Sequence, residues 1–113
     1  MSSRQVGNAR ENRCGAELAL RGYVPFYSRG SRGGADIIAI ADDEHPGLPH
    51  LLVAVSRPTY TAVTVPFRKM RKGPKAAGSK PLLARELEKG RWRWYTDEDH
   101  YFDNLDDALS CLP

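Results

Sequence analysis

Two acidic residues interrupt apolar patterns, and together they could carry metal-dependent chemistry. Glu11 shares a helical stripe with Cys14 and Leu18, a stripe that would face a core. Asp36 opens an apolar run of β type, where a buried charge is costly unless something binds it. Brought together, the two carboxylates would begin a Mg²⁺ site, because this ion takes oxygen ligands. For each acid the alternative is a carboxylate bonded to backbone N–H groups or paired with an arginine.

A second group of candidate functional residues is basic. From Leu51 to Arg85 the chain has eight Lys or Arg residues and no acid, whereas from Glu86 onward it has eight acids and three bases. This asymmetry predicts one face for a polyanion, with nucleic acid as the first candidate, and a solvated basic loop as the alternative. The residues predicted to contact nucleic acid are Arg4, Arg10, Arg29, Arg32, Arg68, Lys69, Arg71, Lys72 and Lys75.

The elements that must position these residues alternate between helix and strand. A helix over residues 7–20 carries Glu11, with a Glu17–Arg21 pair at i,i+4 spacing and Gly22 as its C-cap. Strands are predicted over residues 23–27, 37–41, 51–55, 81–87 and 91–96, and short helices over 66–72 and about 103–112. Pro25 favours an edge position for the first strand, and the second and third strands would form a central hairpin.

This order predicts a single α/β domain over residues 1–113, with a central mixed β-sheet flanked by helices. A content of 41% hydrophobic and 27% charged residues excludes a disordered or fibrous chain. No apolar run approaches the ~18–20 residues of a membrane span, and the N-terminus lacks a signal-peptide core, so we expect a cytoplasmic protein without a membrane partner. Cys14 and Cys111 lack metal-ligand spacing and are predicted to be free, partly buried thiols.

The run from Arg91 to Tyr95 alternates cations and aromatic rings. Such a strand could stack bases and meet phosphates. We favour a structural role, in which the rings pack the sheet while Arg91 and Arg93 point to water, because a period of two separates rings from cations.

Several short motifs follow one another in a familiar order. They are Gly7-Asn8-Ala9-Arg10-Glu11, Gly22-Tyr23-Val24, Gly30-Ser31-Arg32, Ala35-Asp36-Ile37-Ile38-Ala39, Pro81-Leu82-Leu83-Ala84 and Gly90-Arg91-Trp92-Arg93-Trp94. Over residues 4–96 this order resembles the archaeal Holliday junction resolvase family, within the PD-(D/E)XK nuclease fold. The resemblance implies a restriction-endonuclease-like core and Mg²⁺-dependent cutting of branched DNA by a homodimer. It assigns catalysis and metal binding to Glu11 and Asp36, and places Ser31 in a DNA-facing loop.

The chain departs from that family at its central motif. Where the family has an E-x-K on the strand after the Asp, this chain has Ala54-Val55-Ser56. The second metal-binding carboxylate and the lysine that orients water or stabilises developing charge are therefore missing. Arg57 or Lys69 could supply a migrated cation, but neither replaces a metal ligand.

The leading hypothesis is a resolvase-like, nucleic-acid-binding protein of the nuclease fold that is catalytically impaired or inactive, from a phage or a prokaryote. One alternative is an active, Mg²⁺-dependent, structure-selective endonuclease. Another is a nuclease-fold regulator that binds a nucleic-acid-processing protein such as a polymerase. A third is a small structural or toxin-neutralising protein whose basic segment only solubilises it. The expected partner is branched DNA, with a homodimer or a protein partner also possible, and no cofactor is needed if cleavage is lost.

Overall fold

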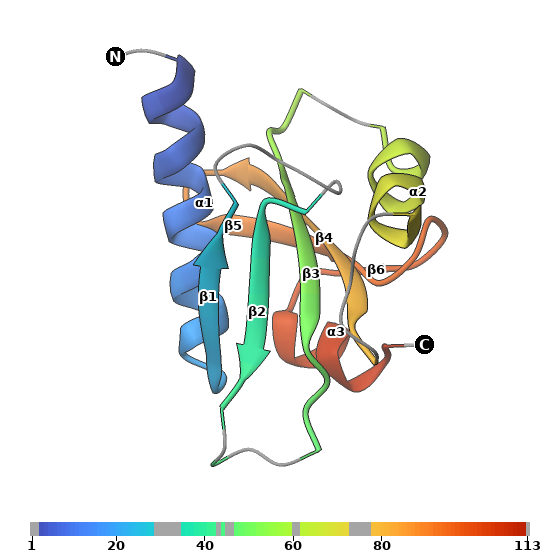
Figure 1. The fold of residues 1–113 in the computed structure, drawn as a ribbon. Helices are drawn as coiled ribbons and strands as arrows, with labels where there is room; N and C mark the ends of the chain where they lie inside the picture. The colour runs from blue at the N-terminus through green and yellow to red at the C-terminus, as the bar shows by residue number, and fades with distance from the viewer. Residues whose placement is uncertain are drawn as a thin grey trace.

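The structure of the chain, a computed structural model, describes residues 3–28, 35–42, 44, 47–59, 62–72 and 78–112. Its elements, in chain order, are α1 (Ser3–Ala19), β1 (Tyr23–Tyr27), β2 (Ile37–Ala41), β3 (Leu51–Ser56), α2 (Thr64–Lys72), β4 (Lys80–Glu88), β5 (Arg91–Tyr95), β6 (Tyr101–Phe102) and α3 (Leu105–Ser110). Figure 1 shows the strands side by side with the helices packed against them. The predicted α/β class, a mixed sheet flanked by helices, is confirmed.

The strands of the sheet lie in space in the same order as in the chain, from β1 to β6. Every neighbouring pair is antiparallel except β3 and β4, which are parallel and are joined through α2. Parallel neighbours require such a crossover because the chain must return to the end of the sheet where it started. The predicted pairing of β2 with β3 is confirmed, with Ile37 opposite Val53. β1 is an edge strand, as Pro25 indicated.

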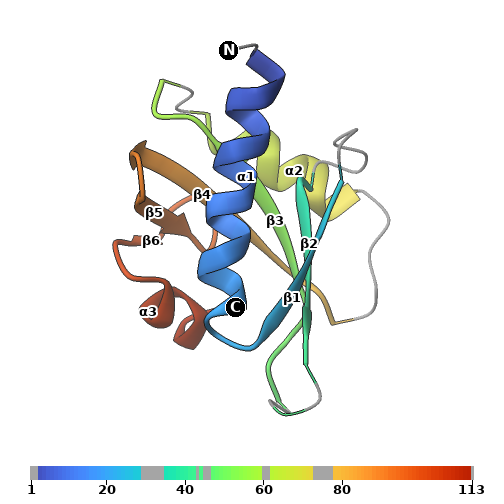
Figure 2. The same cartoon turned by 90° about the vertical axis from the view of Figure 1, so that its left-hand side faces the viewer.

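Helices cover both faces of the sheet. One apolar cluster joins α1 and α3 to the sheet through Cys14, Leu18, Leu105 and Ala108. A second cluster lies on the other face, where Phe67 and Met70 of α2 pack against the strands. In Figure 2, α1 lies in front of the sheet and α2 behind it. Alternate residues of each strand therefore point to opposite faces of the sheet, so side chains that are neighbours in the sequence have different surroundings.

The first helix presents the predicted stripe to the sheet. Cys14 and Leu18 are fully buried and Glu11 is half-buried. The helix begins at Ser3 rather than at residue 7, because a helix tolerates an internal glycine at a modest cost. It ends before Gly22, whose φ of +89° supports the predicted C-cap role, since only glycine adopts this conformation without strain.

The C-terminal half of the chain follows most of the predicted boundaries. The turn between β4 and β5 contains Gly90 at φ +80°. The side chain of Asn104 caps α3 by accepting a hydrogen bond from the backbone N–H of Asp106 at 2.7 Å. The strand β6 was not predicted. It has two residues, too few to carry an alternating pattern, and it exists through its pairing with β5.

Both cysteines are free thiols, as predicted, but their burial differs from the prediction. Cys14 is fully buried and Cys111 is exposed, whereas both were expected to be partly buried. The difference arises because Cys14 lies on the stripe of α1 that faces the sheet, whereas Cys111 follows the last turn of α3. Within the described ranges, no helix combines the length and apolar composition that crossing a membrane requires.

Candidate functional site

Asp36 lies immediately before β2 and joins the end of that strand to its neighbours through its backbone and its side chain. Its N–H donates to the carbonyl of Val53 at 2.8 Å, and its carbonyl accepts from the N–H of Ser28 at 2.8 Å. Its carboxylate oxygen Oδ2 accepts a hydrogen bond from the N–H of Val55 at 2.8 Å. The side chain therefore stabilises the β2–β3 junction, which is one of the two roles considered for it from the sequence.

Glu11 lies on α1, one helical turn before the buried Cys14. Burial raises the pKa of the Cys14 thiol well above its usual value. The further causes, in decreasing order, are the negative charges of Asp36, Glu17, Glu11 and Glu86. Glu11 and Asp36 thus both act electrostatically on the Cys14 thiol.

The positions at which the resemblance predicts an E-x-K motif lie on β3. Ala54 is 5% exposed and belongs to the apolar cluster beneath α2, together with Leu83 and Phe67. Ser56 is also buried, and its hydroxyl donates to the carbonyl of Arg57 at 3.2 Å. No acid and no cation is therefore supplied by these two positions, and the packing around Ala54 is apolar.

Arg85 on β4 is a buried cation that sequence reasoning missed. It lies opposite Ser56 in the parallel register of β3 and β4 and is 5% exposed. Its Nη1 donates to the hydroxyl of Tyr95 at 2.7 Å, and its guanidinium lies 5.0 Å from the centre of that ring. Its Nε and Nη2 have no hydrogen-bond partner among the described residues. Thus a cation does lie beside the lysine position, but on the neighbouring strand and turned toward a tyrosine.

Glu86, the next residue, lies on the opposite face of β4 and is also buried. Arg13 donates two hydrogen bonds to its carboxylate, at 2.7 and 2.6 Å, and Arg10 donates a third at 3.3 Å. The N–H of Gly90 donates a fourth at 3.2 Å. The only sequence signal for Arg85 and Glu86 was a charged pair inside an otherwise apolar strand.

The described residues fall short of the ligand set that a resident Mg²⁺ requires. No group of three or more His, Cys, Asp or Glu side chains within the described ranges is placed to hold a metal ion. Asp36 already accepts a backbone N–H, and Ala54 has no donor atom. Mg²⁺ gives up its waters reluctantly and depends on well-placed oxygen ligands.

The helix α2 carries the best-defined basic surface of the described chain. Phe67 and Met70 are fully buried, and this anchoring directs the intervening cations outward. Arg68, Lys69 and Lys72 are exposed. Arg71 is exposed too, but its Nη1 donates to Glu98 at 3.0 Å. We call Arg68, Lys69, Arg71 and Lys72 the α2 basic surface.

The other predicted contacts to nucleic acid receive less support. Arg10 is bound to Glu86, so its charge is already compensated. Arg4 lies on α1, but its side chain is outside the described part of the chain. Ser31 and the remaining predicted cations, Arg29, Arg32 and Lys75, lie outside the described residues.

The alternating strand β5 has its rings in the interior, as the structural interpretation expected. Trp92, Trp94 and Tyr95 are buried. The expectation that Arg93 points to water is wrong. Its guanidinium lies 4.3 Å from the ring centre of Tyr101, because the unpredicted strand β6 places an aromatic residue beside it. Arg91 is exposed, as predicted.

Comparison with known proteins adds no family to this description: no family model, curated protein or solved structure matches the chain. The described residues thus define an α/β domain with the basic helix α2 on one face of its sheet and the helices α1 and α3 on the other.

Proposed function

We propose that this protein binds nucleic acid, with branched DNA as the preferred form, and that it does so as a resolvase-like member of the nuclease fold with impaired cleavage. The observation that carries the proposal is the α2 basic surface. Four cations project from nine helical residues that contain no acid, and two buried side chains hold the helix against the sheet. A fixed row of cations on one face suits the regularly spaced charges of a phosphate backbone.

The order of the elements supports the nuclease-fold part of the proposal. A helix with Glu11 precedes β1, Asp36 stands at the entry to β2, and the next strand carries the E-x-K position. This is the order that the resemblance to the archaeal resolvases implies. α2 also packs on the cluster that contains Ala54, so this position lies beneath the helix that carries the basic surface.

Binding without efficient cleavage is supported by the residues at the site. Ala54 and Ser56 supply neither a ligand nor a cation, and Asp36 is engaged by the backbone of β3. A metal ion in a phosphodiesterase activates water and neutralises charge, each worth several kcal/mol. Losing a ligand and a cation would cost roughly 4–7 kcal/mol of barrier, or about 10³–10⁵ in rate.

The proposal is tested by titrating a four-way DNA junction and a linear duplex with the protein at several salt concentrations. In the variant with Arg68→Gln, Lys69→Gln and Lys72→Gln, affinity should fall, and the salt slope should decrease by about 0.9 per lost phosphate contact. Arg71 is retained because its guanidinium is already paired with Glu98.

A matched pair of single variants controls this experiment. Lys69 on α2 and Lys89 in the β4–β5 turn are both exposed lysines. Lys69→Gln should weaken binding and lower the slope, whereas Lys89→Gln should change neither. Equal effects of the two substitutions would show that only net charge matters, and would contradict an interface on α2.

A second candidate function, binding to a nucleic-acid-processing protein, is favoured by a different surface. Val24, Phe26 and Ile38 are exposed large hydrophobic residues, and Phe26 lies opposite Ile38 on the same sheet face. Such patches mark protein contacts more often than nucleic-acid contacts. A photo-crosslinking amino acid at Phe26 should then capture a nucleic-acid-processing protein in the native host, and Ile38→Asp should abolish capture. Crosslinks only to a second copy of the chain would contradict this candidate.

A further inference from the structure

The turn between β5 and β6 brings acidic side chains against the end of the α2 basic surface. It spans residues 96–100 and contains the run Asp97-Glu98-Asp99. In Figure 1 this turn lies beside α2, and an ion pair between Glu98 and Arg71 joins the two. A surface suited to a polyanion therefore has a carboxylate of its own bound to one of its cations.

The contact engages both terminal nitrogens of the Arg71 guanidinium. Nη1 donates a hydrogen bond to Oε2 of Glu98 at 3.0 Å, and Nη2 lies 2.5 Å from Oε1. Oε1 is buried and makes no hydrogen bond among the described residues, so the second contact is an ion pair only. A guanidinium uses the same pair of nitrogens to bind a phosphate. Glu98 thus occupies the atoms that a phosphate would need.

Hydrogen bonds on either side of Glu98 hold the turn in shape. The N–H of Thr96 donates to the carbonyl of His100 at 3.1 Å, and the N–H of Asp99 donates to Oδ1 of Asp97 at 2.8 Å. The imidazole Nδ1 of His100 lies 2.8 Å from the same oxygen. None of these bonds involves α2, so the turn should keep its shape when the charge of Glu98 is removed.

Arg71 belongs to the row of cations on α2. Residues three and four apart share a face of a helix, so Arg71 is a neighbour of Arg68, and Arg68 of Lys72. The guanidinium of Arg71 lies 5.3 Å from the ring centre of the buried Phe67, which holds it near the helix. Its side chain is 47% exposed, so a phosphate that displaces Glu98 can reach it.

The pair is charged at neutral pH, but it is not strong. The hydrogen bond from Arg71 lowers the pKa of the Glu98 carboxyl group below its usual value, and burial only partly opposes this effect. The same bond raises the pKa of the Arg71 guanidinium. Because both side chains are partly exposed to solvent, the pair contributes modestly to stability. It can therefore be displaced, but an anion that displaces it binds less tightly.

We propose that Glu98 is an autoinhibitory residue, which takes the place of a DNA phosphate on Arg71 and so lowers the affinity of the α2 basic surface. DNA that reaches Arg71 must displace a carboxylate, and DNA that leaves the pair intact loses one phosphate contact. The inference rests on the proposed function, because it requires DNA on α2.

Glu98→Gln tests the inference, because it keeps the size of the side chain and removes its charge. In titrations of the four-way junction it should tighten binding about fivefold, the upper end for one exposed charge pair. The salt slope should increase by about 0.9, because Arg71 gains a phosphate contact. Adding Arg71→Gln to this variant should return the slope to that of the native chain.

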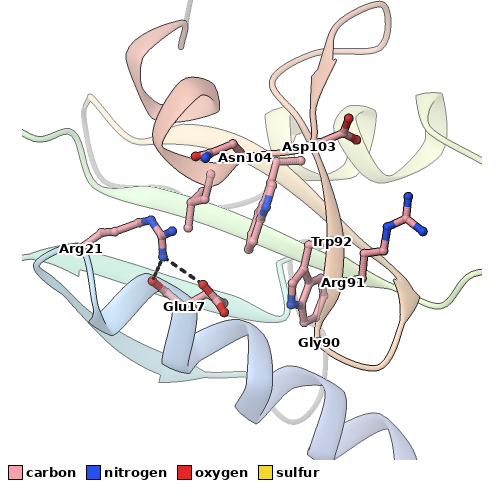
Figure 3. A pocket seen from close by; sticks show the side chains of 9 residues that line it. Glu17, Arg21, Gly90, Arg91, Trp92, Asp103 and Asn104 are labelled. Carbon is pink, nitrogen blue, oxygen red and sulfur yellow. Dashed lines mark hydrogen bonds and ion pairs between the residues drawn. The ribbon is translucent and has the colours of Figure 1, made fainter.

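Glu17→Gln is the matched control. Glu17 is also paired with an arginine, Arg21 at 3.0 Å (Figure 3), but on the face of the sheet opposite to α2. This substitution changes the net charge by the same amount and should alter neither the affinity nor the salt slope.

The inference is overturned if Glu98→Gln binds no more tightly than the native chain, if Glu17→Gln tightens binding as much, or if the double variant keeps the increased slope. A purely structural pair would lower the midpoint of thermal unfolding in Glu98→Gln without a gain in affinity. The substitutions at Arg68, Lys69 and Lys72 separate the two proposals. If they leave binding unchanged, both fail, whereas if they weaken binding and Glu98→Gln does not strengthen it, only this inference fails.

Discussion

Glu86 is a buried carboxylate that is paired with two arginines of another element. Burial alone would raise the pKa of its carboxyl group, but the hydrogen bonds from Arg13 and from the N–H of Gly90 outweigh this effect, so the pKa lies below its usual value. Its bonds to Arg10 and Arg13 join α1 to β4. A single carboxylate thus joins α1 to β4, one of the two parallel strands.

Replacing Glu86 by Gln should destabilise the protein by about 1.5–3 kcal/mol at pH 7, the range for hydrogen bonds to charged groups. A lowered pKa contributes stability that is complete above the unfolded-state value and is lost as pH falls through the folded-state value. The difference between wild type and variant should therefore shrink toward pH 3. Urea unfolding at the two pH values measures it.

Glu88→Gln provides the control on the same strand, because Glu88 is exposed and its ion pair with Arg91 is long at 3.7 Å. Its effect should be close to zero at both pH values. A Glu86→Gln variant as stable as the Glu88→Gln variant at pH 7 would mean that the bonds to Arg10 and Arg13 contribute nothing.

Among the elements, α1 and β1 meet where the side chain of Tyr27 lies over Gly15. Gly15 of α1 is buried, and a Cβ added there would collide with the hydroxyl of Tyr27 and lie 2.7 Å from its Cζ. The glycine is therefore a packing requirement within a helix that would otherwise prefer alanine. The contact explains how the ring of Tyr27 packs against the apolar cluster beneath α1.

Gly15→Ala should lower the free energy of unfolding by about 1–3 kcal/mol, because overpacking outweighs the better helix propensity of alanine. Gly7→Ala tests propensity alone, since nothing lies within 4 Å of a Cβ there, and it should stabilise the protein by up to about 1 kcal/mol. Combining Gly15→Ala with Tyr27→Val should recover part of the loss in thermal unfolding. A neutral or stabilising Gly15→Ala substitution would contradict the close approach.

Over the whole molecule, the α2 basic surface lies on one face of the sheet, and α1 and α3 lie on the other. On the second face Asp106 of α3 is paired with Arg21 at 2.9 Å. A polyanion is attracted to the exposed cations of α2. We expect these cations to orient DNA on the α2 side.

The native chain should therefore bind four-way junctions without detectable cleavage at millimolar Mg²⁺. A variant with Ala54→Glu and Ser56→Lys should regain cleavage if the rest of the site is intact. It should also be less stable, since position 54 is buried among apolar side chains. Efficient symmetric nicking by the native chain, abolished by Asp36→Asn, would establish the active endonuclease instead. Gel assays of labelled junctions distinguish these outcomes.

Local sequence information was sufficient wherever neighbouring residues carry the signal. The bounds of β1 and β2 were predicted without error because the apolar run of β1 lies between Gly22 and Ser28, and that of β2 between Asp36 and Asp42. The Glu17–Arg21 pair was predicted as well, since it depends on two residues four positions apart. The order of motifs also led to Asp36 at a strand entry, but not to its bond with the N–H of Val55.

Only the tertiary structure decided which residues that are far apart in the sequence lie together in space. Glu86 meets Arg13 across 73 positions, and the parallel pairing of β3 with β4 brings Arg85 beside Ser56. No local pattern encodes such contacts, because they depend on how α2 crosses the sheet and on which face of a strand each side chain enters. The sequence by itself determined the α/β class, the acids at α1 and β2 and the basic stretch. The packing of helices on the sheet decided that one acid bonds to the backbone, that α2 turns its cations outward, and that Glu98 pairs with Arg71 of α2.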